Sequence, residues 1–109
     1  MRALVCGGRT FSDAAALDRA LGLLPITLLI HGGAPGADRL AGDWAHAHGV
    51  PYRVYFAEWN KHGRSAGGLR NTRMLVEGKP DVVVAFPGGY GTANMVRQAR
   101  AAGVPVITP

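Results

Sequence analysis

The sequence predicts an α/β fold of the Rossmann-like kind, a doubly wound sandwich of about five mostly parallel strands with helices on both faces. Short apolar runs and helix-patterned stretches alternate along the chain in nearly strict order. Such alternation specifies a parallel sheet covered on both faces, whose strands read as unbroken apolar runs. Three of these runs end in glycine-rich turns, and the carboxyl ends of parallel strands face a common crevice.

Length and composition indicate one small domain. The 109 residues have a mass of 11.4 kDa, and we expect a single Rossmann-like unit over residues 1–109. Apolar residues make up 48% of the chain and charged residues 17%, below the roughly 25% of an average soluble domain. Because few charges cover the surface, we expect a homo-dimer or a higher homo-oligomer.

The charge balance favours an anionic partner. Twelve Lys and Arg residues against seven Asp and Glu give a formal net charge of +5, and most of the cations are arginines. The planar guanidinium of arginine suits bidentate contacts to phosphate. A nucleotide and a nucleic acid are both compatible with this charge.

Cysteine content and hydropathy indicate a cytoplasmic protein. Cys6 is the single cysteine, so no intramolecular disulfide forms, and its place at the end of an apolar run predicts a core residue. No apolar run reaches the roughly 18 residues of a membrane span, and the N-terminus lacks the layout of a signal peptide. We therefore expect no membrane partner. The histidines show no metal-ligand spacing, so we expect no metal either.

The first half of the chain predicts three strands separated by two helices. The first helix is predicted because its apolar residues recur at helical spacing. Ser12 or Asp13 can cap it, and Pro25 ends it. The second helix carries Trp44 and His48 on the face that we expect to meet the core. The other expected bounds are residues 3–6, 26–30 and 50–56 for the strands and residues 38–48 for the second helix.

The second half begins with a long polar segment. Residues 57–69 show no clear period and are rich in glycine and polar groups, which predicts a loop that is either functional or mobile. After it come a helix at residues 70–77, a strand at 81–86, a helix at 93–102 and a strand at 104–107.

Three glycine-rich turns are the expected binding elements. Residues 87–92 read Pro-Gly-Gly-Tyr-Gly-Thr between a strand and a helix, where bare backbone N–H groups and the positive helix end suit a phosphate. Residues 7–10 and 31–36 form two similar turns after other strands. Neither the Gly-x-Gly-x-x-Gly fingerprint nor a P-loop occurs, which disfavours a dinucleotide dehydrogenase and a P-loop nucleotidase.

Polar and aromatic side chains near these turns complete the expected site. Arg9, Arg64 and Arg70 are candidate phosphate ligands, with surface charge as the alternative for each. Asp38 either caps the second helix or accepts a hydrogen bond from a ribose hydroxyl or an arginine. One further pair, Trp59 and Tyr90, either stacks on a base or packs in the core or a dimer contact; His31 and His62 flank the crevice.

The order of these motifs resembles the SLOG superfamily, and within it the YspA/YpsA-related branch. The resemblance runs over essentially the whole chain and is carried by residues 7–9, 31–38, 62–71 and 87–92. It implies a Rossmann-like fold and a nucleotide or nucleotide-derived ligand. Relatives in the superfamily include the LONELY GUY phosphoribohydrolases and the DNA-processing protein DprA, which binds single-stranded DNA.

Two positions depart from the phosphoribohydrolase pattern. Arg70 and Asn71 resemble an Arg-Lys pair of those enzymes with the lysine replaced, and Arg70 is the candidate catalytic residue. The glutamate that the resemblance expects three positions after Gly-Thr falls on Met95, which cannot transfer a proton or stabilise a cation by charge. Asn94, one position earlier, can still bond a ribose hydroxyl.

Three functions follow from this pattern. The favoured one is binding of a nucleotide or a derivative, as in a sensor, without a required cofactor. The alternatives are hydrolysis of such a ligand by a phosphoribohydrolase-type reaction and binding of single-stranded nucleic acid. The residues expected to contact the ligand are Gly8, Arg9, Gly32, Gly33, Gly36, Asp38, Arg64, Arg70, Asn71, Pro87, Gly88, Gly89, Gly91, Thr92 and Asn94.

Overall fold

The five predicted strands form one parallel sheet. The computed structural model describes all 109 residues and orders the strands β3-β2-β1-β4-β5. This order is that of a doubly wound Rossmann-like sheet, so the predicted fold class is confirmed. The strands are β1 (Arg2–Cys6), β2 (Leu28–His31), β3 (Tyr52–Val54), β4 (Val82–Ala85) and β5 (Val106–Ile107).

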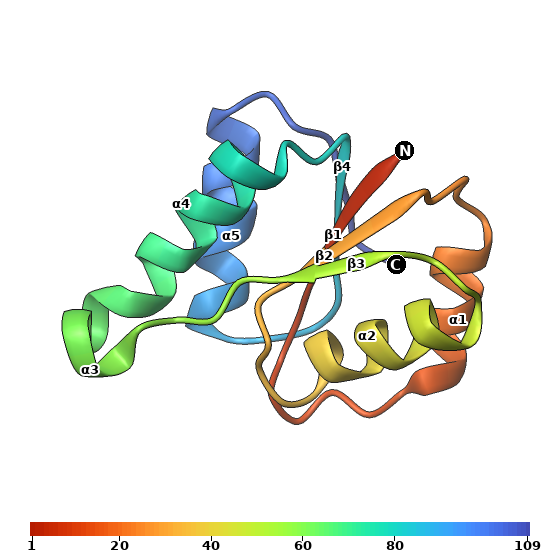
Figure 1. Cartoon of the computed structure of the whole chain (residues 1–109), viewed down its shortest axis with the longest axis horizontal. Coiled ribbons are helices and arrows are strands. Elements are labelled where there is room, and N and C mark those ends of the chain that lie inside the picture. Colours follow the sequence, from red (N-terminus) through yellow and green to blue (C-terminus); the bar gives the residue numbers. More distant parts are fainter.

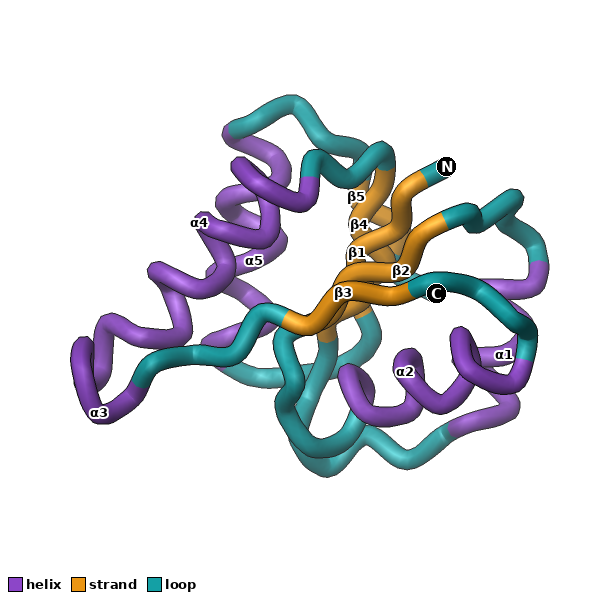
Figure 2. The backbone as a smooth tube through the Cα atoms, viewed as in Figure 1, coloured by secondary structure: helices purple, strands orange, loops and turns teal.

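Two pairs of helices cover the two faces of the sheet. In Figures 1 and 2 α1 and α2 lie on one side of the strands, and α4 and α5 lie on the other. No helix has the length and apolar character needed to cross a bilayer. The helices are α1 (Ala14–Gly22), α2 (Ala37–Ala47), α3 (Trp59–His62), α4 (Ala66–Gly78) and α5 (Tyr90–Ala101), with a 3₁₀ turn η1 (Gly63–Ser65) before α4.

Alternate strand residues feed two separate cores. Val5 of β1 packs with α1 and α2, whereas its neighbours Leu4 and Cys6 pack with α4 and α5. The same alternation holds in β2 for Leu29 and Ile30. Since successive side chains of a strand point to opposite faces, an unbroken apolar run is what a doubly covered sheet requires.

The expected loop at residues 57–69 is partly helical, so this prediction is wrong. α3, η1 and the first turn of α4 lie within it. Glycine lowers intrinsic helix propensity, which hid the start of α4 at Gly67 and Gly68. Tertiary contacts favour small residues there, because a Cβ on Gly67 would lie 3.4 Å from the Trp59 ring and one on Gly68 would lie 3.7 Å from the Asn94 amide.

One of two predictions about α2 needs correction. Trp44 packs against the α1–α2 core as predicted, although it is only partly buried, and its indole N–H donates to Asp18 Oδ1 at 3.0 Å. His48 is exposed and stacks on the Trp44 ring with 4.3 Å between ring centroids. At the start of α1 the capping residue is Asp13, whose carboxylate accepts the Ala16 N–H at 3.0 Å.

Candidate ligand-binding site

A cavity lies where the order of the sheet reverses. β1 and β4 are neighbours in the sheet, although the helices that follow them lie on opposite faces. Ligands of doubly wound sheets bind at such a switch point, beyond the carboxyl ends of the strands. The cavity has a volume of about 700 Å³, and its walls include the turns after both strands. We call it the switch-point pocket.

Some of the predicted glycines hold the turns against each other. The N–H of Gly8 donates to the carbonyl of Pro87 at 2.8 Å, and a Cβ on Gly8 would lie 2.9 Å from that oxygen. A Cβ on Gly88 would overlap the Gly8 amide, and one on Gly36 would overlap the Gly8 carbonyl. Packing of one turn on another therefore requires glycine at these three positions.

At Gly89 and Gly91, by contrast, packing within the chain does not require glycine. A Cβ on Gly89 or Gly91 would meet no atom within 4 Å, and neither residue has a positive φ. Both line the switch-point pocket. Glycine at these positions leaves the pocket open, although nothing in the chain itself requires it.

The N-terminus of α5 opens into the same pocket. Gly89 is the capping residue and supplies no side chain to accept a hydrogen bond. The N–H groups of residues 88–92 have no acceptor within the chain. Free N–H groups at the positive end of a helix form a site for an anion.

Arg70 lies in the wall of the pocket, and two of its three guanidinium nitrogens donate hydrogen bonds within the chain. Its Nε donates to Asn71 Oδ1 at 3.0 Å, and its Nη1 donates to the carbonyls of Gly32 and Tyr55. Nη2 has no acceptor in the chain. Burial lowers the pKa of Arg70, while the Asp38 carboxylate opposes that change. The guanidinium is thus oriented by the fold, with one nitrogen left for a ligand.

Asp38 organises the second glycine turn. Its Oδ2 accepts the N–H groups of Gly32 and Ala34, each at 3.1 Å. The capping residue of α2 is Gly36, so of the two alternatives for Asp38 the one in which it caps this helix is wrong. Burial raises the pKa of Asp38, although the Ala34 amide and Arg70 partly offset the rise. It is the one carboxylic acid in the pocket wall.

Asn71 connects α4 to the start of α5. Its Nδ2 donates to the carbonyl of Gly91 at 3.1 Å and to Asn94 Oδ1 at 3.0 Å. Asn94 Oδ1 also accepts from Gln98 Nε2 at 2.8 Å. These bonds fix α5 relative to Arg70. Met95, where the resemblance expects a glutamate, is fully buried in the α4–α5 core and does not line the pocket.

Comparison with known proteins gives the family. The family model described as "YspA, cpYpsA-related SLOG family" matches residues 1–62, more than half of the chain. The chain is also 40% identical over 118 residues to "Gene 61 protein" of Mycobacterium phage D29, a match that covers 97% of this chain and 94% of that protein. The chain belongs to the YspA, cpYpsA-related SLOG family.

In this SLOG-family chain not every predicted residue reaches the switch-point pocket. Arg64 and Asn94 line an adjacent cavity of about 620 Å³. Trp59 and Tyr90 line both cavities and are 49% and 97% exposed, which excludes core packing for either ring. Of the predicted contacts, Gly8, Arg9, Asp38, Arg70, Asn71, Pro87, Gly88, Gly89, Gly91 and Thr92 line the switch-point pocket, and Gly32, Gly33 and Gly36 do not.

Sequence reasoning missed part of the pocket wall. Met74 follows Arg70 by one helical turn, so helical spacing could have indicated it. Thr10 belongs to the first glycine turn and could also have been named. Ala34 belongs to the second glycine turn, whereas nothing local marks Gly67. The full set of such residues is Cys6, Gly7, Thr10, Ala34, Gly67 and Met74, whereas Trp59 and Tyr90, which also line the pocket, were expected beside it.

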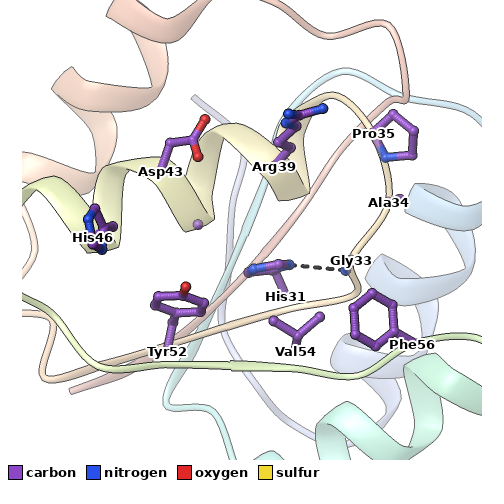
Figure 3. A pocket seen from close by; sticks show the side chains of 11 residues that line it. His31, Gly33, Ala34, Pro35, Arg39, Asp43, His46, Tyr52, Val54 and Phe56 are labelled. Atoms are coloured by element: carbon purple, nitrogen blue, oxygen red, sulfur yellow. Dashed lines mark hydrogen bonds between the residues drawn. The ribbon is translucent and has the colours of Figure 1, made fainter.

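The predicted histidines lie outside the switch-point pocket. His31 lines a cavity of about 600 Å³ between α2 and the β2–β3 edge of the sheet. Figure 3 shows its ring between helix α2 and the side chains of Tyr52 and Val54. His62 is exposed beside α4. Neither imidazole is placed to act on a ligand at the start of α5.

Proposed function

We propose that the protein binds a nucleotide or a nucleotide-derived ligand in the switch-point pocket, with a phosphate on the N-terminus of α5. The observation that carries the proposal is the pair Gly89 and Gly91, which keep space in front of unpaired N–H groups without a structural need for glycine. Membership of the SLOG family supports a nucleotide-related function. The basic charge of +5 favours the same ligand class.

The remaining groups of a nucleotide have matching partners in the walls. Arg70 and the exposed Arg9 are the two cationic residues that line the pocket, and either can contact a phosphate. The exposed rings of Trp59 and Tyr90 offer flat surfaces for a base. The pocket is rich in donors and holds a single carboxylic acid, so we propose a binding protein, such as a sensor, that needs no cofactor.

A titration with a filled pocket tests this proposal. Gly91→Leu adds a side chain where the pocket is open and improves helix propensity, so the fold is retained. Calorimetry with AMP, ADP-ribose, NAD and cyclic nucleotides is expected to show binding that this variant weakens by about tenfold or more. Gly22→Leu, also in a helix with no atom near its Cβ, is the matched control. Absence of binding to the whole panel at millimolar concentration contradicts the proposal.

Hydrolysis is a second candidate because Asp38 brings a carboxylic acid with a raised pKa to the pocket. Incubation with nucleoside monophosphates and chromatography for free base distinguishes it from binding. Release of base by the unmodified protein, lost in Asp38→Asn, supports a phosphoribohydrolase-type reaction. Tight binding without free base rejects it.

Single-stranded nucleic acid is a third candidate. Trp59 and Tyr90 form a shared wall of two adjoining cavities, and Arg64 and Arg97 line the outer one. Exposed rings beside arginines are the usual elements of a single-strand groove. A mobility assay over a salt series decides, because such binding weakens steeply with salt. No complex at the lowest salt excludes this candidate.

We also propose self-association through the outer face of α4. Leu69 and Val76 lie two helical turns apart on this helix and are 45% and 66% exposed. They are therefore apolar neighbours on one exposed face. With a single buried cysteine, we place this homo-oligomer in the reducing cytoplasm.

A further inference from the structure

The cavity beside α2, which we call the edge cavity, is separate from the switch-point pocket. It lies between α2 and strands β2 and β3, and Ala34 is the one residue that lines both cavities. Tyr52, Val54 and Phe56 supply an apolar wall from the edge strand and the residues after it. Figure 3 shows these side chains across from Asp43 and His46 of α2. An apolar cavity with a few convergent polar groups is typical of a small-molecule site.

His31 presents one fixed hydrogen-bond donor to this cavity. The N–H of Gly33 donates to His31 Nδ1 at 3.0 Å, so in the neutral ring the proton is on Nε2. The side chain is only 6% exposed, and Nε2 has no partner in the chain. Burial lowers the pKa of His31 and favours this neutral form. No buried side-chain nitrogen or oxygen lacks a hydrogen-bond partner, so the Nε2–H group is reached from the cavity, where a ligand acceptor can take the place of water.

Gly42 keeps this nitrogen accessible. It lies inside α2, where glycine is less favourable than alanine, and its φ is not positive. A Cβ at this position would lie 2.9 Å from His31 Nε2. The glycine thus weakens the helix but leaves room beside the imidazole.

The remaining groups indicate a flat and uncharged ligand. The rings of His31 and Tyr52 are nearly parallel, with 22° between their planes and 6.0 Å between centroids. Phe56 is 66% exposed beside them. The rim on α2 carries both Arg39 and Asp43, so a phosphate gains little there compared with the start of α5. An aromatic ring lies well against such a wall.

We propose that the edge cavity is a second binding site, for an uncharged heteroaromatic ring that carries a hydrogen-bond acceptor. The acceptor bonds to His31 Nε2–H, and the ring lies against Tyr52 and Phe56. The site goes beyond the nucleotide pocket, because it uses none of the groups proposed to hold the phosphate.

Chemical-shift mapping with simple rings tests this site. Nicotinamide and adenine, added at millimolar concentration to ¹⁵N-labelled protein, are expected to shift the amides of Gly33 and Gly42 and the imidazole of His31 in a saturable way. Cyclohexanecarboxamide has the acceptor of nicotinamide but no aromatic ring, and we expect it to bind much more weakly. Saturable shifts confined to residues around Trp59 and Tyr90, or no shifts with either ring, overturn the proposal.

Two variants separate the contacts. Gly42→Ala places a methyl group against Nε2 and is expected to abolish the shifts, whereas Gly22→Ala, in open space on α1, leaves them unchanged. Tyr52→Ala changes a half-exposed edge residue and is expected to weaken binding about fivefold or more, as loss of one stacking partner does. This second variant decides the question if Gly42→Ala does not fold. Equal binding by all variants rejects the site.

One control separates this site from the nucleotide pocket. Gly91→Leu fills the switch-point pocket and is expected to bind nicotinamide like the unmodified protein. Loss of nicotinamide binding in that variant assigns the ring to the switch-point pocket and contradicts a second site. Failure of nucleotide binding with retained nicotinamide binding contradicts the proposed function alone.

Discussion

Burial makes the thiol of Cys6 unreactive. The thiol lines the switch-point pocket but is 7% exposed, and burial, with a smaller effect of Asp38, raises its pKa to about 12. The thiolate is the reactive form, so very little of it exists at neutral pH. The residue is a core side chain, as its place at the end of an apolar run predicts.

We therefore expect slow modification of Cys6. At pH 8 a disulfide reagent is expected to react with the native protein at least about a hundredfold more slowly than with protein unfolded in urea. The absorbance of the released thiolate gives both rates. A native rate equal to that of the unfolded chain contradicts the assigned burial and pKa.

His31 makes stability depend on pH. Its pKa in the folded protein is lowered from 6.5, mainly by burial and also by Arg70, while Asp43 partly opposes this change. Below pH 6.5 the unfolded chain binds a proton that the folded protein does not bind. The stabilisation is therefore present above pH 6.5 and is lost as pH falls towards the folded pKa.

A comparison with His31→Gln isolates this effect, because glutamine keeps an acceptor for the Gly33 N–H and does not titrate. As pH falls from about 7 to 5, the free energy of unfolding is expected to decrease more in the unmodified protein. Each unit of pKa lowering corresponds to about 1.4 kcal/mol. Urea unfolding at several pH values measures it, and parallel pH curves would refute the assignment.

At the end of helix α4, close packing and helix termination both favour glycine, but at two successive positions. Gly78 is inside the helix because a Cβ there would lie 3.0 Å from Ile30 Cδ1, so the small residue allows α4 to pack on β2. The left-handed position that follows therefore falls on Lys79, with φ of 49°. It is the single non-glycine residue with positive φ, at a place where glycine is usual.

Lys79→Gly is expected to raise the free energy of unfolding by about 0.5–1 kcal/mol, since it relieves left-handed strain at the expense of a more flexible unfolded chain. Thermal or urea unfolding measures the change. Lys79→Ala retains the strain and serves as the control, with little expected change. A glycine variant that is less stable than the alanine variant contradicts this account.

The surface of the molecule carries large apolar side chains that belong to neither core, among them Leu69 and Val76 of α4. If α4 forms the proposed contact between copies, Val76→Lys is expected to convert a dimer to a monomer of 11.4 kDa without loss of helical structure. Light scattering after size exclusion gives the mass. Leu23→Lys, at an 85% exposed residue after α1, is the control and is expected to leave the dimer intact. A monomeric unmodified protein rules out the contact.

The sequence by itself determined the fold class and the positions of the glycine turns. Apolar runs, helical spacing and the Asp13 cap are local signals, and the chirality and connection rules of parallel sheets turn such a series into one topology. The strand order brings the turns after β1 and β4 together, as the alternation predicts. Contact of these residues with a ligand remains a prediction.

Only the tertiary structure decided what each residue does. It separates Gly36 and Gly88, which allow backbones to pack, from Gly89 and Gly91, which face open space. It also shows that Asp38 accepts a hydrogen bond from the second glycine turn, and that Gly42 of α2 leaves room beside the His31 ring. These roles depend on atoms that are distant in the sequence and meet only after folding. Local patterns therefore specify elements, while packing specifies sites.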